Sequence, residues 1–303
     1  YFIINFFTFS LFFYFLIKKS NKLKSKKLFF IYGWIFGFGY FSTNLYWISI
    51  SLTFDQNYEF LIPLTIFLIP SFLALFYGII SFIFLTCKPK NGLSSLLWFS
   101  LIFGVVEFVR GTILTGFPWN LIAYSFSNQL EFISVIPVIG TYGFNLFCIL
   151  MFTCPAILFI KVTSRYITFN ISIFFIVILF FIYGSMYKKK FDNTVDKNLD
   201  YKIRVIGSQI GLEKFYSEVD PVVIIRDLIK ISKPDLNDKT IFIWPEGIVP
   251  DITQQGLVEY KWLFEENFNE NHLFIIGINS EVIENGSKNY FNTLSVYDVN
   301  LNL

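Results

Sequence analysis

Six long apolar runs follow one another in the first 187 residues of the chain. A helix needs about 20 mostly apolar residues to cross a bilayer, so the pattern predicts six membrane spans with soft edges. The spans cover residues 1–17, 28–50, 60–86, 93–111, 132–160 and 167–187. Lysines follow the first run instead of preceding it, which argues against a signal peptide. The first run is also short, and we expect a fragment that is open at both ends.

The pattern changes near residue 190, after which the polar residues 191–200 are typical of a linker. Residues 201–209 alternate between apolar and polar positions, like a strand with one buried face. Three apolar runs predict further strands, and two segments have helical spacing. The predicted strands cover 240–244, 273–278 and 290–297, and the predicted helices cover 219–231 and 257–268. We therefore expect a multi-pass α-helical membrane domain in residues 1–190 and an α/β domain in residues 201–303.

Composition agrees with this division. Apolar residues make up 54% of the chain and charged residues only 15%, whereas a typical soluble domain carries about 25% charged residues. A wholly soluble globular protein, a disordered chain and a secreted disulfide scaffold are therefore excluded. The three cysteines have neither zinc-ligand nor CxxC spacing, and the single histidine, His272, opens an apolar run. We expect that His272 is structural and that the chain holds no metal.

Charge divides the chain at the same place and predicts its orientation. Residues 1–190 hold 14 Lys and Arg against 4 Asp and Glu, while residues 191–303 hold 10 against 18. Three basic loops fall on one side of the membrane by alternation, and the positive-inside rule makes that side cytoplasmic. These loops contain Lys18 to Lys27, Lys88 and Lys90, and Lys161 and Arg165. Lys188, Lys189 and Lys190 conflict with this orientation, because they follow the sixth span on the outer side.

One carboxylate stands out in the α/β domain. Trp244-Pro245-Glu246-Gly247 follows directly on the predicted strand 240–244. Sites of α/β proteins form at the carboxyl ends of such strands. Partial burial at the rim of an apolar wall suits a general base, and we expect Glu246 to be mostly buried. A glutamate in a turn that faces water is the alternative.

Two charged residues interrupt the fourth predicted span. Glu107 and Arg110 are three residues apart and share a helix face. Charges at membrane depth are costly unless they are paired or hydrated, so we expect a structural pair that clamps the helix to the next loop. That loop contains Phe117 and Trp119. It is either an interfacial aromatic anchor or the rim of a lipid entry cleft.

Several of these segments resemble a known superfamily. Residues 241–246 (IFIWPE) resemble the strand that carries the catalytic glutamate of the nitrilase, or carbon–nitrogen hydrolase, superfamily. Residues 205–214 resemble its first strand and the loop after it. Residues 290–293 (YFNT) resemble the aromatic–Asn strand that precedes its catalytic lysine.

The membrane part narrows the resemblance to one family. Residues 107–111 (EFVRG) and the loop 116–119 (GFPW) are similar to the pattern of the apolipoprotein N-acyltransferases. Residues 45–47 and 140–143 fit the same family. The resemblance extends over nearly the whole chain. It implies that residues 201–303 are part of a nitrilase-like α-β-β-α sandwich.

The resemblance also implies an activity. Such an N-acyltransferase moves an acyl chain from a phospholipid, through a cysteine thioester, to the α-amine of the N-terminal diacylglyceryl-cysteine of apolipoproteins. Glu246 would be the general base of a Glu–Lys–Cys triad. The partners would be the phospholipid donor, the apolipoprotein acceptor and the membrane, with no nucleic acid and no cofactor. The protein would lie in the bacterial inner membrane with its catalytic domain in the periplasm.

The sequence departs from the family pattern in two places. Phe215 follows Lys214 where the family usually has Trp, and we treat Phe215, Phe117 and Trp119 as candidate substrate contacts. The triad lysine and cysteine are expected beyond Leu303, because Lys288 precedes the aromatic–Asn strand. The three cysteines, Cys87, Cys148 and Cys154, lie in the membrane part and cannot replace the nucleophile. The 303-residue chain alone is therefore expected to be inactive.

Three alternatives stay open. A membrane-tethered carbon–nitrogen hydrolase or amidase would share the nitrilase strands but has no reason to carry the GFPW loop. A transporter would need more ionisable residues at mid-membrane than these spans contain. A catalytically dead membrane scaffold would lack the rest of the triad.

Overall fold

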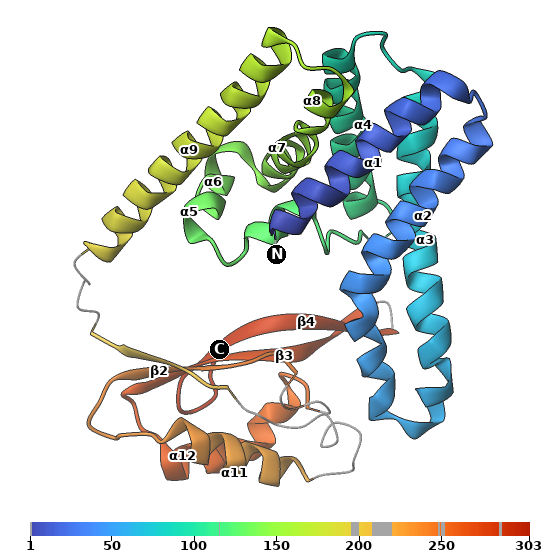
Figure 1. Ribbon diagram of the computed structural model, residues 1–303. Coiled ribbons are helices and arrows are strands. Elements are labelled where there is room, and N and C mark those ends of the chain that lie inside the picture. Colours follow the sequence, from blue (N-terminus) through green and yellow to red (C-terminus); the bar gives the residue numbers. More distant parts are fainter. Residues whose placement is uncertain are drawn as a thin grey trace. The chain divides into compact units, whose positions relative to one another are not determined.

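The computed structural model describes residues 2–114, 116–194, 200–207, 220–247, 249, 252–284 and 287–303 (Figure 1). The chain divides into two compact units, Tyr1–Thr194 and Val195–Leu303. The first unit is helical, and the second is built on a β-sheet. This confirms the predicted fold class of apolar helices followed by a partial α/β domain. Each unit is described by itself below.

Six longer helices form the body of the helical unit. They are α1 (Phe2–Lys22), α2 (Lys26–Leu45), α3 (Ile62–Thr86), α4 (Gly92–Thr112), α7 (Thr141–Thr153) and α9 (Ser164–Asp192). Short helices connect them: α5 (Leu130–Ile133), α6 (Ile136–Ile139), α8 (Ala156–Ile160) and the 3₁₀ helices η1 (Tyr46–Phe54), η2 (Gln56–Leu61) and η3 (Ile122–Phe126).

Five helical segments among the described residues are long and apolar enough to cross a membrane. They are Phe2–Lys22, Gln56–Thr86, Gly92–Thr112, Thr141–Ile160 and Ser164–Asp192. The predicted span 28–50 is not among them. The α-helix of this segment ends at Leu45 and continues as η1. Glycine, tyrosine and asparagine residues lower the hydropathy of the helix.

The predicted span 132–160 is wrong as a single helix. Gly140 has a φ of +75° and separates α5 and α6 from α7, so the apolar span begins at Thr141. A φ in this region favours glycine, which lacks the Cβ that would clash. The hydropathy of the segment is continuous across the break. The apolar pattern alone therefore gave no sign of the turn.

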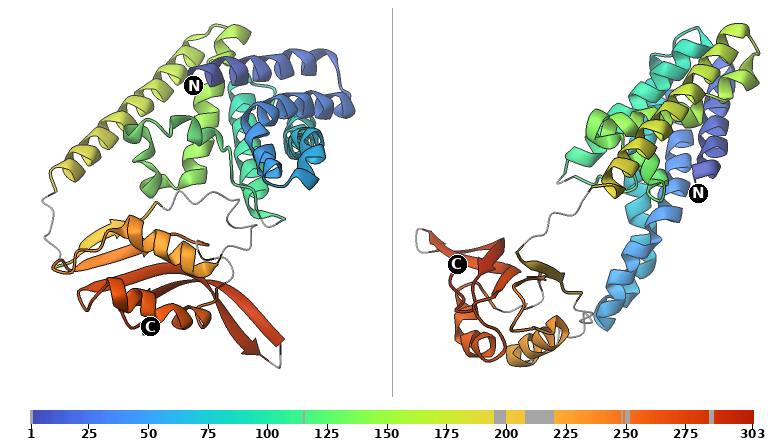
Figure 2. Two further views of the ribbon diagram at one scale, coloured as in Figure 1. Left: turned by 90° about the horizontal axis from the view of Figure 1, so that it is seen from below. Right: turned by 90° about the vertical axis from the view of Figure 1, so that its left-hand side faces the viewer.

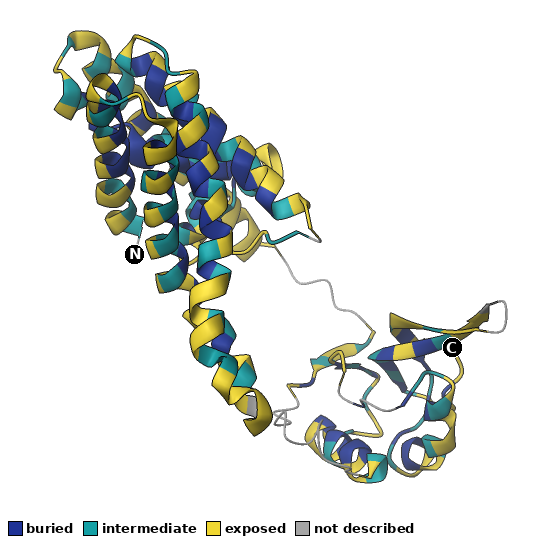
Figure 3. Ribbon diagram, turned by 90° about the vertical axis from the view of Figure 1, so that its right-hand side faces the viewer, coloured by how far each residue is buried: buried dark blue, intermediate teal, exposed yellow. Residues whose placement is uncertain are grey.

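Close helix contacts and phenylalanine rings build the core of the helical unit. At Gly33 on α2, a Cβ would lie 2.2 Å from the carbonyl oxygen of Tyr77 on α3. Small residues allow membrane helices to approach this closely. Phe9 of α1, Phe99 and Phe103 are fully buried, whereas the outer faces expose large apolar side chains (Figure 3). Such an outer surface is expected where lipid replaces water.

The three basic loops lie at one end of the helical unit, at its top in Figure 1. Lys88 Nζ donates hydrogen bonds to Ser20 Oγ at 2.6 Å and to Asn21 Oδ1 at 3.1 Å. The hydroxyl of Tyr166 donates to Asn91 Oδ1 at 3.4 Å. The predicted alternation of the loops is therefore seen within this unit.

One of the three lysines that conflicted with the positive-inside rule forms an ion pair. Lys188 Nζ lies 3.2 Å from Glu131 Oε1, and this contact joins the last turns of α9 to α5. A backbone N–H and the Lys188 ammonium lower the pKa of Glu131. Part of the positive charge after the sixth span is thus neutralised by an acid of the adjacent loop.

The second unit contains a four-stranded sheet in the order β1-β2-β3-β4. The strands are β1 (Lys202–Val205), β2 (Thr240–Trp244), β3 (His272–Glu284) and β4 (Ser287–Tyr297). β1, β2 and β3 are parallel neighbours, and β4 is antiparallel to β3. The helices among the described residues are α11 (Pro221–Ser232), α12 (Lys261–Asn267) and the 3₁₀ helix η4 (Gly256–Tyr260). Each predicted strand and helix of this unit has a counterpart among the described residues, and residues 208, 209 and 219 of the predictions lie outside them. β2 has the predicted bounds, and the edges of the others are shifted.

The two faces of the sheet differ. Both α-helices lie on one face (Figures 1 and 2), where Phe242, Trp244 and Phe274 are buried. The other face is also apolar, but among the described residues nothing covers it. On that face, Val205 and Leu294 are each 72% exposed. Apolar residues on both faces are typical of a sheet that is covered on both sides.

Candidate functional site

The carboxylate singled out in the sequence lies where the chain leaves the sheet. β2 pairs with β3 up to Trp244, and Pro245 then turns the chain away. Glu246 follows, and Gly247 has a φ of +67°. The side chain of Glu246 is exposed, so the expectation that it is mostly buried is wrong. The apolar run correctly predicted the strand. Glu246 is nevertheless open to solvent, because no described residue covers this face of the sheet.

Two residues of the β3–β4 hairpin hold Glu246. Asn292 Nδ2 on β4 donates a hydrogen bond to Glu246 Oε1. On β3, a Cβ added at Gly277 would lie 2.6 Å from Glu246 Cα, so the backbone of Glu246 crosses directly over this glycine. Asn292 belongs to the predicted aromatic–Asn strand, whereas Gly277 was missed. Only the cross-strand contact shows why glycine is needed there.

Two cavities meet at Glu246. One, of about 200 Å³, is lined by Glu246, Gly247, Val249, Ile278, Asn279 and Asn292. The other, of about 380 Å³, is lined by Glu246 with residues of β2, β3 and β4, among them Trp244, Ile275 and Leu294. Glu246 is the one carboxylate among the described lining residues. The arrangement can accept a proton from a group that enters either cavity, as a general base must.

Three other residues considered in the sequence belong to this unit. Lys214 and Phe215 lie outside the described residues. His272 is buried; its Nδ1 accepts from the Asn269 N–H at 3.1 Å, and its Nε2 lies 3.0 Å from the Asp235 carbonyl oxygen. This is the structural histidine that the sequence predicted. Within the described ranges, no group of three or more metal-binding side chains is found.

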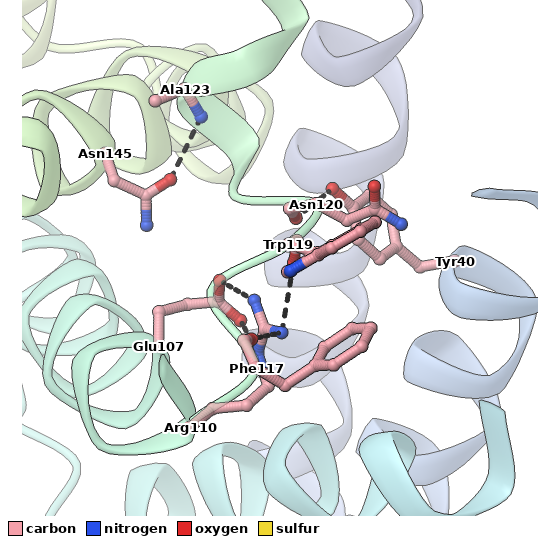
Figure 4. Close-up of polar contacts among 8 residues, drawn as sticks. All are labelled: Tyr40, Glu107, Arg110, Phe117, Trp119, Asn120, Ala123 and Asn145. Atoms are coloured by element: carbon pink, nitrogen blue, oxygen red, sulfur yellow. Dashed lines mark hydrogen bonds and ion pairs between the residues drawn. The ribbon is translucent and has the colours of Figure 1, made fainter. Parts of the chain in front are cut away.

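In the helical unit, Arg110 joins α4 to the loop that follows it (Figure 4). Its Nε and Nη2 donate to the two carboxylate oxygens of Glu107 at 3.1 and 2.7 Å. Its Nη1 donates to the carbonyl oxygens of Phe117 at 2.7 Å and Trp119 at 3.1 Å. Both charged side chains are 0% exposed. This geometry is that of a clamp between helix and loop.

Glycines make the same connection possible. Gly116 has a φ of +81°, and a Cβ there would lie 2.6 Å from the Gly111 carbonyl oxygen. A Cβ on Gly111 would lie 2.0 Å from the Tyr142 hydroxyl of α7. Gly116 is thus required by the turn, and Gly111 lets the Tyr142 hydroxyl approach the end of α4 closely. They allow the loop to fold back on the end of α4.

The two aromatic residues of the loop belong to a stack. The Trp119 ring lies 5.3 Å from that of Trp47 in η1 and 6.0 Å from that of Phe117, nearly parallel to both. Trp119 is 52% exposed. Tyr40 and Asn145 support the next residues, because Tyr40 donates to the Asn120 carbonyl at 3.0 Å and Asn145 accepts from the Ala123 N–H at 3.0 Å (Figure 4). Sequence reasoning missed both, although Asn145 is a polar residue within an apolar helix.

The family pattern and this geometry occupy the same part of the chain. The model of the apolipoprotein N-acyltransferase N-terminal domain matches residues 1–154, about half of the chain, including α4 and its loop. The chain belongs to the apolipoprotein N-acyltransferase family. With five apolar helices of spanning length, membership of this family makes it a bacterial membrane protein.

Curated apolipoprotein N-acyltransferases are similar to this chain, two of them over most of its length. The protein of Brucella melitensis is 27% identical over 282 residues, which cover 88% of this chain and 51% of the relative. That of Rickettsia typhi is 29% identical over 256 residues, covering 84% and 50%. A third, from Rhizobium rhizogenes, is 34% identical over 127 residues. The chain spans about half the length of the first two relatives.

Proposed function

We propose that the protein containing this chain is an apolipoprotein N-acyltransferase that acts on a phospholipid donor and a diacylglyceryl-apolipoprotein acceptor. Family membership together with the position of Glu246 carries the proposal. Glu246 is a carboxylate at the end of a strand. It accepts a hydrogen bond from Asn292 and lines two cavities. A general base needs this kind of access to the group from which it takes a proton.

In the first half-reaction, Glu246 takes the proton of a cysteine thiol. The thiolate attacks the carbonyl carbon of a phospholipid acyl ester, and the ester C–O bond breaks. The proton passes to the oxygen of the departing lysophospholipid, and an acyl thioester remains on the enzyme. We assign the cysteine, and a lysine that stabilises the oxyanion, to the half of the relatives' length that this chain does not span.

In the second half-reaction, the α-amine of the acceptor's N-terminal cysteine attacks the thioester. Glu246 takes the proton that the amine loses, and the thiol leaves with a proton regained. The product is an amide, and the enzyme returns to its starting state. Both substrates carry acyl chains, which explains why the catalytic unit follows a membrane unit.

We propose a periplasmic position for the α/β unit. The basic loops share one end of the helical unit, where Lys88 contacts Ser20 and Asn21. At the other end of α9, Lys188 is paired with Glu131. The positive-inside rule assigns the first end to the cytoplasm, and α9 then leads to the outer side.

Acyl transfer by the purified full-length protein tests the proposal. Phosphatidylethanolamine with a labelled acyl chain and a diacylglyceryl-cysteine peptide are supplied together in detergent micelles. We expect the label on the peptide amine, and only when both substrates are present. Hydrolysis of an amide substrate with no transfer to the peptide would indicate the amidase instead. If neither a covalent intermediate nor a product forms, the protein is a catalytically dead membrane scaffold instead.

A further inference from the structure

The proposed base has one side-chain partner among the described residues. Asn292 Nδ2 donates to Glu246 Oε1, and Glu246 forms no ion pair within the described parts of the chain. The described residues that line the two cavities beside it carry no second titratable group. The orientation of this carboxylate therefore depends on the Asn292 amide more than on any other described side chain.

The hairpin fixes where that amide lies. Asn292 is in register with Asn279 of the neighbouring β3, inside a ladder that extends along the whole of β4. On β3, two residues before Asn279, Gly277 carries the backbone of Glu246 at a distance that leaves no room for a Cβ. The amide is thus located by backbone pairing, and the carboxylate by a close backbone contact with the same hairpin. A side chain on a regular strand is a more precise support than one on a loop.

We propose that Asn292 is a positioning residue for Glu246. Its N–H occupies one carboxylate oxygen and leaves the other directed at the group that gives up its proton. The inference rests on the proposed role of Glu246 as the base, and it adds a residue that does not itself touch the reacting atoms.

The chemistry predicts different results for two substitutions. Asn292→Ala removes the donor and leaves space. Asn292→Asp keeps the shape but sets a carboxylate against a carboxylate, which disfavours ionisation of both. Both variants should fold, because Asn292 is exposed on β4 and lines the cavities beside Glu246 that the proposed function keeps open. Asn300→Ala is the matched control, since Asn300 is an exposed asparagine after the end of β4.

The test measures acyl-thioester formation by the full-length protein in liposomes of labelled phosphatidylethanolamine, between about pH 5 and pH 9. Loss of a hydrogen bond to a charged group predicts a rate about 10- to 100-fold lower for Asn292→Ala. The acid limb of the pH profile should move to higher pH for Asn292→Asp, in which a second carboxylate faces Glu246. Asn300→Ala should match the wild type in both respects. Thermal unfolding of each variant checks that it is folded.

Each other outcome is decisive. An unmoved acid limb for Asn292→Asp would show that residue 292 does not act through Glu246, which would make Asn292 merely structural and overturn the inference. Equal acylation rates for Asn292→Ala and Asn300→Ala, with Glu246→Gln inactive, would also overturn the inference. The proposed function would then still stand. If Glu246→Gln itself acylates at the wild-type rate, the proposed base is wrong and Asn292 has nothing to position.

Discussion

Arg110 is bonded to Glu107 through both carboxylate oxygens, and the two side chains are completely shielded from solvent. Removing one partner of such a pair leaves an uncompensated buried charge, which costs about 3–5 kcal/mol. We expect Arg110→Leu and Glu107→Leu each to lower the free energy of unfolding by that amount. The double variant should be less destabilised than the sum of the two. Thermal unfolding in detergent measures this.

Arg110→Lys separates charge from geometry. Lysine keeps the charge but cannot donate to Glu107 and to the loop carbonyls of Phe117 and Trp119 at once. It should therefore be destabilised nearly as much as Arg110→Leu. A lysine variant as stable as the wild type would show that charge alone matters and that the clamp is unimportant.

The stack of Trp119 on Trp47 predicts an energetic coupling between η1 and the loop. Aromatic pairs contribute about 0.5–1.5 kcal/mol beyond the area they bury. In a double-mutant cycle with Trp47→Leu and Trp119→Leu, we expect a coupling of that size in the free energy of unfolding. Trp34 stacks on Phe38 instead, so Trp34→Leu with Trp119→Leu should be additive. Equal coupling in both cycles would exclude a specific stack.

The orientation of the helical unit can be tested with engineered cysteines. Cys87 is exposed and is first replaced by serine, while Cys148 and Cys154 are buried. A membrane-impermeant thiol reagent applied from outside should label Glu59→Cys but not Lys22→Cys. Both should react after the membrane is permeabilised. The reverse pattern in intact cells would invert the proposed orientation.

The bare sheet face makes a prediction about the rest of the protein. Val296 lies on that face, paired with Ile275, and is 48% exposed. If a second sheet covers the face, as the family resemblance implies, Val296→Asp buries an unpaired charge in the full-length protein. The expected loss of stability is about 3–5 kcal/mol, whereas Asn300→Asp should be mild. Equal effects on thermal unfolding would mean that the face stays open.

Local patterns in the sequence predicted much of the fold. The run TIFIW predicted β2 with its bounds, and Pro245 marked where the strand ends, because both signals depend on neighbouring residues. Glu107 and Arg110 were predicted to pair because three residues bring them to one helix face. The structure adds what Arg110 does with its remaining donors.

The missed features depend on contacts between distant segments. The exposure of Glu246 depends on what covers the sheet, and its bond to Asn292 joins residues that are 46 positions apart. The need for glycine at 277 appears only when the backbone of Glu246 crosses it. The break at Gly140 is hidden in a run of continuous hydropathy. Periodicity within one segment contains none of this information.

Acyl-enzyme formation by Glu246→Gln in the full-length protein tests the central claim most directly. Glutamine keeps the shape of the side chain and cannot accept the thiol proton, and a general base contributes about 10²- to 10⁴-fold to a rate. With labelled phosphatidylethanolamine, we expect the thioester to form that much more slowly while folding and membrane insertion are kept. Glu265→Gln, which alters only the exposed pair with Lys261, should acylate normally. Acylation of Glu246→Gln at the rate of the Glu265 variant would contradict the account.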